Sequence, residues 1–311
     1  MQDKLVTVFG GSGFLGRYVV QALLKSGARV RIAARDPREA WHLKSQGGLG
    51  QTQFVAADIR KPESVSRAIA GSDAAVNLVG ILKGDFQALH VDGARNIAQA
   101  ATASGVSALA HVSAIGADPA STSAYGRSKG EGEAAMRAAF PATTILRPSI
   151  VFGREDGFVN RFAGLIAMLP VVPIIRGAAK FQPVYVGDVA KAIVAALADP
   201  GAHGGQTYEL GGPEVITMGD LNRWIARETG RRRAFVEMPD AIAGAMASGL
   251  GWMPGAPMTR DQWLMLQSDN VVAPDARGLS AFGIVATPLE AVAEGWLVRY
   301  RRQGRFADKT Q

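Results

Sequence analysis

Short apolar runs alternate with longer amphipathic stretches through the first half of the chain. Six runs have the length and composition of buried strands: residues 5–9, 29–34, 52–57, 74–79, 108–113 and 143–147. Stretches with the helical spacing of apolar residues lie between them, notably residues 14–25, 86–104 and 124–139. Strands that alternate with helices indicate βαβ units. The pattern therefore predicts an α/β fold, a doubly wound parallel sheet with helices on both faces.

This rhythm breaks after about residue 149, where glycine and proline become frequent. One strand, residues 184–186, and one helix, residues 193–197, return before a final part with a mixed, mainly helical pattern. We therefore expect a first domain at residues 1–150, whose core also receives about residues 182–198. Residues 151–311 are expected to form a smaller, mainly helical C-terminal cap.

Composition limits the class of protein. The chain has 311 residues, of which 48% are apolar and 20% are charged, as in an ordinary soluble globular protein. The absence of cysteine excludes disulfides, and the four histidines lack the spacing of metal ligands, so we expect no metal site. The first residues show no secretion signal, and no run of about 18–20 apolar residues predicts a membrane-spanning helix.

The charge is unevenly distributed. The formal net charge is +7, and basic residues cluster at residues 231–233 and in the tail, residues 299–309. No nucleic-acid-binding motif accompanies them, so we expect no nucleic acid partner. The tail suits an anionic membrane surface, or merely keeps the protein in solution. The uncharged segment at residues 241–258 either joins the tail in a docking surface or is buried.

A glycine-rich turn separates the first predicted strand from the first predicted helix. It reads Gly10-Gly11-Ser12-Gly13-Phe14-Leu15-Gly16. Glycines at positions 10, 13 and 16 let the backbone turn tightly and approach a pyrophosphate, whose charge the helix N-terminus favours. A branched side chain at Gly13 is expected to crowd both the pyrophosphate and the contact between helix and strand. This turn predicts that the sheet is of the Rossmann type and binds a dinucleotide.

The end of the second strand bears on the choice of dinucleotide. Folds specific for NAD place an acidic residue here, whereas this chain has Arg35, whose planar guanidinium matches a 2′-phosphate. Arg17 and Arg38 are candidates to assist, and Asp36 opposes the phosphate. We therefore predict NADP(H) rather than NAD(H). After the third strand, Asp58 either meets the adenine amino group or caps the next turn.

A tyrosine and a lysine four residues apart, Tyr125 and Lys129, open the helix after the fifth strand, which ends at Ser113. Their spacing places them on one face of a helix. There the ammonium group is expected to lower the phenol pKa and to hold the nicotinamide ribose, so that the tyrosine can exchange a proton during hydride transfer.

Together these features resemble the extended or atypical short-chain dehydrogenase/reductase superfamily. Within it, the chain is similar to the branch of the nucleotide-binding accessory subunit of respiratory complex I (NADH dehydrogenase [ubiquinone] alpha subcomplex subunit nine) and its bacterial relatives. The similarity covers nearly the whole chain. The segments that carry it are Arg-Pro-Ser-Ile-Val-Phe-Gly-Arg-Glu-Asp at residues 147–156, Gln-Pro-Val-Tyr-Val-Gly-Asp-Val at residues 182–189 and Phe-Gly-Ile-Val-Ala-Thr-Pro-Leu-Glu at residues 282–290.

The resemblance implies a tightly held NADP(H) with a structural role, complex I subunits as partners, and a peripheral location on the cytoplasmic face of the inner membrane. It implies cofactor contacts by Gly10, Ser12, Gly13, Phe14, Leu15, Gly16, Arg35, Asp58, Ile59, Val79, Tyr125, Lys129, Pro148 and Ser149.

One departure concerns catalysis. Extended dehydrogenases usually carry two or three Ser or Thr residues where this chain has Ser113-Ala114-Ile115, so a catalytic set of Ser113, Tyr125 and Lys129 is incomplete if the hydroxyl belongs at Ala114. Two alternatives therefore stay open. One is an active NADPH-dependent reductase or epimerase on a small molecule such as a quinone precursor, and the other is a nucleotide-sensing regulator.

Overall fold

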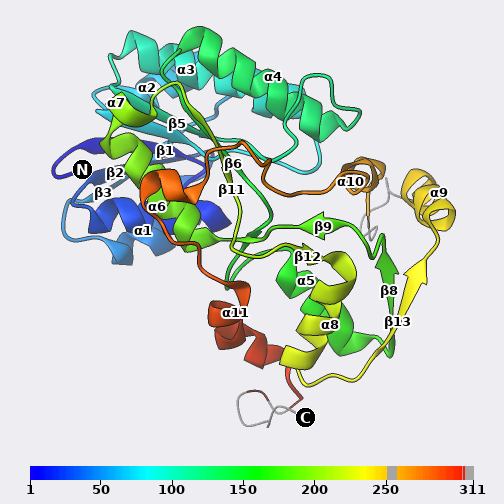
Figure 1. Ribbon diagram of the computed structural model, residues 1–311. Coiled ribbons are helices and arrows are strands. Elements are labelled where there is room, and N and C mark those ends of the chain that lie inside the picture. The colour runs from blue at the N-terminus through cyan, green and yellow to red at the C-terminus, as the bar shows by residue number, and fades with distance from the viewer. Residues whose placement is uncertain (251–257, 303, 305–311) are drawn as a thin grey trace. The chain divides into compact units, whose positions relative to one another are not determined.

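The computed structural model describes residues 1–250, 258–302 and 304 (Figure 1). They form two compact units, which are described separately. The first unit consists of Met1–Pro148, Val186–Leu210 and Ala273–Val285, and the second contains the other described residues. After residue 148 the chain therefore returns to the first unit twice. Residues 273–285, which were expected in the cap, fall in the first unit, where the Arg277 carbonyl accepts a hydrogen bond from the Glu209 N–H.

Seven parallel strands make the sheet of the first unit, in the order β11-β6-β5-β4-β1-β2-β3. They are β1 (Leu5–Phe9), β2 (Arg29–Ala34), β3 (Thr52–Ala56), β4 (Ala74–Asn77), β5 (Ala108–Val112), β6 (Thr144–Pro148) and β11 (Thr207–Leu210). The predicted α/β fold of the Rossmann type is confirmed, and the six predicted strands agree with the structure to within two residues. The seventh strand, β11, was not predicted.

Helices cover both faces of this sheet (Figure 1). One face carries α1 (Phe14–Lys25) and α6 (Val186–Ala198), and the other carries α2 (Pro62–Ile69), the π-helical turn η2 (Gln87–Asp92), α3 (Gly93–Ala103) and α4 (Ala124–Ala139). Short helices η1 (Pro37–Gln46), α7 (Pro200–His203) and η3 (Leu279–Phe282) complete the unit. Fully buried Phe9, Val65, Ile97, Leu109 and Met136 form the core on the α2–α3–α4 side.

The second unit is mainly helical. Helices α5 (Val159–Met168), α8 (Met218–Glu228) and α11 (Leu289–Leu297) pack around buried Phe152, Ile166, Leu221, Trp224 and Trp296. Three two-stranded sheets accompany them: β7 (Val151–Phe152) with β10 (Val184–Tyr185), β9 (Lys180–Phe181) with β12 (Ile216–Thr217), and β8 (Val171–Ile175) with β13 (Ala234–Met238). The remaining elements are α9 (Asp240–Leu250), α10 (Arg260–Met265) and η4 (Val298–Tyr300).

The returning segment differs from its prediction. Val184 and Tyr185 pair with β7 in the second unit, and the large sheet receives only the helix that follows, α6. Among the described residues, none of the helices combines the length and apolar character needed to traverse a bilayer.

Glycine at position 16 is required by a close backbone approach. An ideal Cβ there would lie 2.5 Å from the carbonyl oxygens of both Gly10 and Gly11, so the first turn of α1 sits directly on the preceding loop. At Gly13 a Cβ would meet only the Gly10 oxygen, at 3.4 Å, which is ordinary contact. A Cβ therefore fits at Gly13 but collides with the preceding loop at Gly16, and the expected effect of a branched side chain at Gly13 stays a prediction.

We expect Gly16→Ala to lower the free energy of unfolding by about 1–3 kcal/mol, the usual cost of overpacking, because neither carbonyl can move without disturbing the turn. Urea denaturation measures this loss. Gly13→Ala is the matched control, with an expected change below about 1 kcal/mol. Equal losses in the two variants would contradict this account of the turn.

Candidate functional site

The order of the strands locates the site in the first unit. The chain winds in one direction from β1 through β2 to β3, and in the other from β4 through β5 to β6 and β11. In such sheets a ligand binds outside the carboxyl ends of the strands where the winding reverses, which here is between β1 and β4. The loop after β1 contains the glycine-rich turn, and the loop after β4 begins at Leu78.

The two loops are in close contact. Gly10 has a φ of +80°, which favours glycine, and a Cβ on it would lie 3.2 Å from both the Leu78 carbonyl carbon and the Val79 nitrogen. Leu78 in turn donates its N–H to the Phe9 carbonyl, at 2.9 Å. The expected cofactor contacts Gly10 and Val79 therefore lie side by side.

The N-terminus of α1 is open to an anion. Gly13 is the N-cap residue, no side chain caps the helix there, and its first turn contains no acidic residue. Ser12, Phe14 and Leu15 complete this turn and are half-buried. The backbone N–H groups and the helix dipole therefore favour a phosphate group at this position, which fits the pyrophosphate of a dinucleotide.

Three charged residues follow β2. Arg35 is exposed and makes no hydrogen bond or ion pair with the described part of the chain. Arg38 instead forms a fork with Asp36, donating from Nε to Oδ1 at 2.9 Å and from Nη2 to Oδ2 at 2.8 Å. These hydrogen bonds lower the pKa of Asp36 and compensate its charge. Arg35 is thus available to a 2′-phosphate, whereas Arg38 is already paired.

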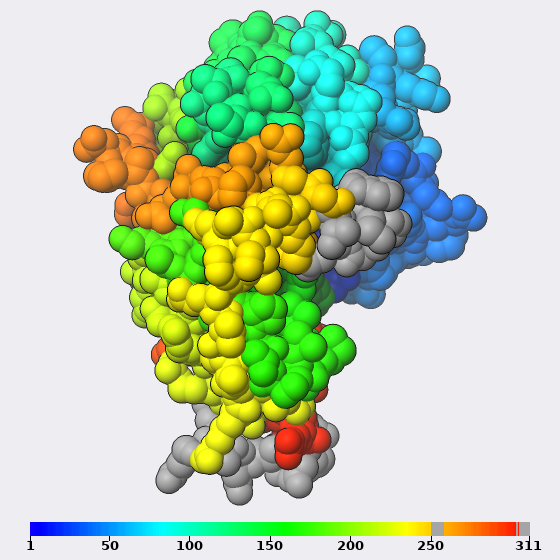
Figure 2. Space-filling view, turned by 90° about the vertical axis from the view of Figure 1, so that its right-hand side faces the viewer, coloured from blue at the N-terminus to red at the C-terminus, as the bar shows by residue number. Residues whose placement is uncertain are grey.

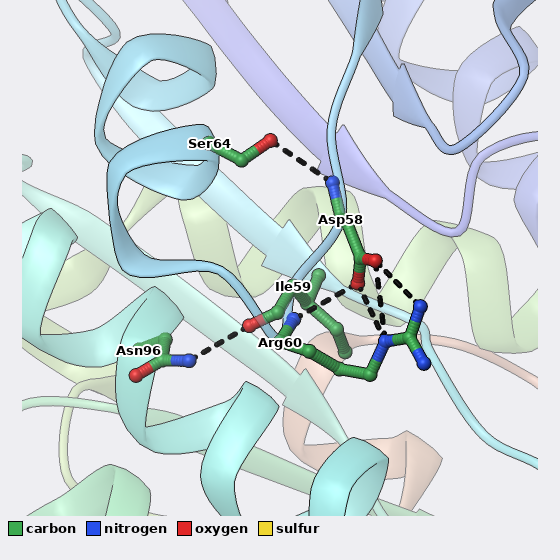
Figure 3. Close-up of polar contacts among 5 residues, drawn as sticks. All are labelled: Asp58, Ile59, Arg60, Ser64 and Asn96. Carbon is green, nitrogen blue, oxygen red and sulfur yellow. Dashed lines mark hydrogen bonds and ion pairs between the residues drawn. The ribbon is translucent and has the colours of Figure 1, made fainter.

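Asp58 is held by its own turn (Figure 3). Its carboxylate accepts hydrogen bonds from the Arg60 N–H at 3.1 Å and from the Arg60 guanidinium at 2.6 Å. The bond to the Arg60 side chain is the main reason that the pKa of Asp58 falls to about 2. The Ile59 carbonyl accepts from Asn96 of α3, at 2.8 Å. Asp58 therefore caps this turn, and its contact with adenine stays a prediction.

The candidate catalytic residues lie around the carboxyl end of β5. Lys129 is buried on α4 and donates from Nζ to the Val112 carbonyl, at 2.8 Å. Ser113, the next residue along the chain, has a buried hydroxyl without a hydrogen-bond partner among the described residues. Tyr125 is half-buried one helical turn before Lys129. The structure therefore brings Lys129 to the end of the strand that carries Ser113, and an unpaired hydroxyl there fits a polar ligand.

Burial sets the protonation of this pair. Burial raises the pKa of Tyr125 to about 12, and it lowers the pKa of Lys129 to about 8. The expectation that Lys129 lowers the phenol pKa is therefore wrong for the free protein. A tyrosine with so high a pKa is a poor general base at neutral pH, since catalytic groups work best near the operating pH.

Three polar residues next to this pair were not recognised from the sequence. Asn77 accepts the Val79 N–H at its Oδ1 atom, so its Nδ2 group donates to Nδ1 of His111, at 3.1 Å. The proton of neutral His111 is then on Nε2, which is buried without a partner among the described residues. His90 bridges the β4 loop to α4. The sequence offers one signal for Asn77, which is that a polar residue ends the otherwise apolar run 74–77.

The two cofactor contacts expected at the end of β6, Pro148 and Ser149, fall in different units. Pro148 ends β6, and its carbonyl accepts from the Ile115 N–H at 3.1 Å. Ser149 begins the second unit, where its hydroxyl is hydrogen-bonded to Oδ1 of Asn270 at 2.6 Å. The hydroxyl of Ser149 therefore stabilises the second unit, and its contact with a cofactor stays a prediction.

The second unit carries the expected docking residues. On α9, Ile242 is 58% exposed while Ala243 and Ala247 are buried, so neither full burial nor full exposure describes the uncharged segment. Val171 of β8 and Val236 of β13 are 49% and 56% exposed on the sheet that these two strands form, and Figure 2 shows the green and yellow segments of this part of the chain at the surface. Residues 251–257 of the segment lie outside the described residues.

The basic residues of the second unit are largely engaged. Arg301 donates to the Glu228 carbonyl at 3.0 Å, and Arg299 donates to Oδ1 of Asn160 at 2.5 Å. Arg233 donates to the Ile166 carbonyl, at 2.8 Å. The prediction that the basic tail from residue 299 belongs to a docking surface stays a prediction: Arg299 is exposed although hydrogen-bonded, Arg301 is half-buried, and residues 305–309 lie outside the described residues. Among the described residues no cluster of three or more His, Asp or Glu side chains suits a metal ion.

Comparison with known proteins identifies the family. Residues 6–211 match the model of the NAD dependent epimerase/dehydratase family. Subunit 9 of the NADH dehydrogenase [ubiquinone] 1 alpha subcomplex of Mus musculus is 37% identical, over 96% of this chain and 80% of that protein. The 40 kDa subunit of NADH-ubiquinone oxidoreductase of Neurospora crassa is 33% identical over the same shares. A ceramide reductase of Caulobacter vibrioides is 28% identical, over 94% of this chain and 96% of that protein.

Solved structures share the fold. An NADPH-dependent quinone oxidoreductase of Escherichia coli, complexed with NADPH, superposes with a TM-score of 0.76 at 22% identity, covering 94% of this chain and 99% of that one. The triphenylmethane reductase of Citrobacter sp. complexed with NADP(H) gives the same TM-score at 20% identity, over the same shares. The chain therefore belongs to the NAD dependent epimerase/dehydratase family, in the group that contains alpha subcomplex subunit 9 of NADH dehydrogenase [ubiquinone].

Proposed function

We propose that this protein binds NADP(H) and serves as an accessory or assembly subunit of respiratory complex I, with the cofactor in a structural role. The observation that carries the proposal is the similarity of 33–37% over 96% of the chain to complex I subunits. The site of the first unit supports the cofactor. It combines an uncapped helix N-terminus, a glycine cradle and an unpaired arginine at the position of the 2′-phosphate.

The chemistry of the site supports a structural role. In this proposal the pyrophosphate binds at α1 and the nicotinamide half lies toward β4 and β5, near Val79, Ser113, Tyr125 and Lys129. NADP(H) would supply a hydride donor or acceptor there. The free protein, however, holds the phenol of Tyr125 protonated, with a pKa of about 12. A cofactor bound in such a site stabilises the fold by mass action without turnover.

A second candidate is an active NADPH-dependent reductase on a small molecule such as a quinone precursor. It is favoured by the presence of Ser113, Tyr125 and Lys129 and by the 28% identity to a ceramide reductase over nearly both full lengths. Steady oxidation of NADPH by the purified protein with a quinone or ketone substrate would favour this candidate over a structural cofactor.

The second unit supports a peripheral location on the cytoplasmic face of the inner membrane. Val171 of β8, Val236 of β13 and Ile242 of α9 expose apolar side chains, and α9 has no charged residue after Asp240. Arg232, two residues before β13, is exposed. Exposed apolar groups beside basic residues combine burial in a headgroup layer with attraction to anionic lipid.

The first prediction of this proposal concerns cofactor choice. We expect the wild-type protein to bind NADPH about 10- to 150-fold more tightly than NADH, since a charge-assisted contact contributes about 1.5–3 kcal/mol. Arg35→Ala should remove most of this preference without weakening NADH binding, as measured by titration calorimetry. Arg38→Ala is the control, because Arg38 is paired with Asp36 and its loss should change the ratio little. Equal wild-type affinities would contradict the assignment.

The second prediction concerns pH. The ammonium form of Lys129 is expected to donate to the cofactor ribose, and the pKa of about 8 means that this form is lost above pH 8. NADPH affinity should therefore fall about 10-fold between pH 7 and pH 9.5. Lys129→Met should bind weakly at pH 7 and show no such fall. Lys44→Met, which removes an exposed lysine of the same unit, should behave like wild type.

The same titration has the opposite effect on the free protein. The unfolded chain keeps the Lys129 proton up to about pH 10.5, whereas the folded chain loses it near pH 8, so stability rises with pH in this interval. Above about pH 10 the raised pKa of Tyr125 reverses the trend, because the folded tyrosine keeps a proton that the unfolded one loses. Urea unfolding of wild type and Lys129→Met between pH 7 and pH 10 checks the rise, which the variant should lack.

The third prediction concerns location. We expect part of the wild-type protein in native membranes, co-migrating with complex I and retaining NADP(H). Val236→Glu with Ile242→Glu should reduce this pool, because it puts charge on the apolar surface. Val285→Glu, on a valine of the first unit that is 89% exposed, is the control. Truncation before Trp296 is unsuitable, since Trp296 and Leu297 belong to the core.

The outcome also tests the proposed function. A protein that stays wholly in the soluble fraction and never co-migrates with complex I would refute the accessory-subunit role. Mass spectrometry of the co-migrating proteins and of the retained nucleotide identifies partners and cofactor in the same sample.

A further inference from the structure

His90 occupies an unusual place in the first unit. It lies in the π-helical turn η2, where the Gly93 N–H bonds to the carbonyl of Ala88, five residues earlier. Its own carbonyl lies so close to α4 that a Cβ on Gly132 would collide with it. The side chain of His90 is buried as well, although histidine is seldom fully buried. Single π-helical turns are frequent at functional sites.

The hydrogen-bond partners of His90 determine which of its two ring nitrogens carries the proton. The Ile81 N–H donates to Nε2 at 3.0 Å, so Nε2 carries no proton. Nδ1 therefore carries it and donates to the hydroxyl of Ser128 at 2.8 Å. That hydroxyl donates to the carbonyl of Tyr125, at 2.9 Å. A continuous chain of hydrogen bonds thus runs from the β4 loop through His90 and Ser128 to the backbone carbonyl of Tyr125 on α4.

Stacking fixes the imidazole between the same two elements. The Phe86 ring stacks on it at 5.3 Å, and the Tyr125 ring meets it edge-on at 5.6 Å and 85°. The imidazole is also neutral, because burial and the charge of Lys129 lower the pKa of His90 to about 4. A neutral ring keeps its acceptor at Nε2 across the physiological range, and it adds no second positive charge beside Lys129.

The loop from Gly80 to Gly84 is held in place by its hydrogen bond to His90. Within the described part of the chain, the Ile81 N–H to His90 is the hydrogen bond that joins residues 80–84 to another element. Leu82 and Lys83 are exposed, so little apolar burial holds the loop. The loop follows Val79 directly, at the strand end where the winding of the sheet reverses.

We propose that His90 is a positioning residue that pins the loop Gly80–Gly84 to the face of α4 bearing Tyr125 and Lys129, and so shapes the nicotinamide half of the cofactor site. The inference rests on the proposed binding of NADP(H). It concerns the half of the cofactor beyond the pyrophosphate, since His90 contacts neither the glycine-rich turn nor Arg35.

The test compares two nucleotides on the full chain. NADPH has the nicotinamide half, whereas 2′,5′-ADP has only the half that binds at α1 and Arg35. His90→Phe keeps the ring stacking but loses both hydrogen bonds, and we expect it to weaken NADPH about 10-fold while changing 2′,5′-ADP less than about 2-fold. Hydrogen exchange of residues 78–86 in the free protein should become faster. His90→Gln retains an acceptor and a donor, and it should restore both properties to within about 3-fold of wild type.

Two further variants separate positioning from stability. His203→Phe removes another hydrogen-bonded histidine of the same unit, whose ring packs tilted against Phe282, and it should leave both affinities and the exchange of residues 78–86 unchanged. Ser128→Ala removes only the hydrogen bond between His90 and α4 and leaves the one between His90 and Ile81. It therefore tests the proposal even if His90→Phe folds poorly. It should weaken NADPH and spare 2′,5′-ADP.

The failures are distinguishable. A wild-type protein that binds neither nucleotide would overturn the proposed function and this inference together. A second outcome is that the wild-type protein binds both NADPH and 2′,5′-ADP, while His90→Phe and Ser128→Ala weaken the binding of the two nucleotides equally or not at all. That result would refute this inference and leave the proposed function standing. If His90→Gln binds NADPH as weakly as His90→Phe, or exchanges residues 78–86 as fast, the hydrogen-bonding role of His90 is likewise refuted.

Discussion

At the carboxyl end of β1 the first turn of α1 rests on the carbonyl groups of the preceding loop, with no room for a side chain at Gly16. The contact sets the direction in which α1 leaves the sheet, and hence where its unsatisfied N–H groups point. Gly10 makes a similar approach to the start of the β4 loop. The anion site at α1 and the neighbouring β4 loop both depend on these two positions, since a side chain at either would separate the elements.

Burial is the second constraint on the site. Lys129, His90 and His111 are buried close together, and the low polarity of their surroundings shifts each toward its neutral form. The same burial keeps the proton on Tyr125. At neutral pH Lys129, with a pKa of about 8, still carries most of its charge, whereas the two histidines are neutral, so Lys129 is the cation of this cluster that can attract an anionic ligand. These properties suit a retained nucleotide better than a poised proton-transfer pair.

In the second unit, arginines act on helix ends. Arg233 donates to carbonyls in the last turn of α5, and Arg301 donates to the carbonyl of Glu228, the last residue of α8. A guanidinium at a helix C-terminus satisfies open carbonyls and opposes the helix dipole. Much of the basic charge that the sequence concentrates at residues 231–233 and 299–301 thus holds the unit together.

Periodicity and local motifs determined the parallel sheet, six of its seven strands, the helices α1 and α4, and the glycine-rich turn, because these features depend on residues close in sequence. Tertiary structure decided the rest. β11 is a short strand that joins the sheet edge beside β6, and residues 273–285 join the first unit through long-range contacts that no local pattern encodes. The raised pKa of Tyr125 depends on burial, which only the packed structure produces. His90 shows the difference most clearly: its place in an apolar helix pattern was visible, but its partners Ile81 and Ser128 are 9 and 38 residues away and meet it only when β4, η2 and α4 pack together.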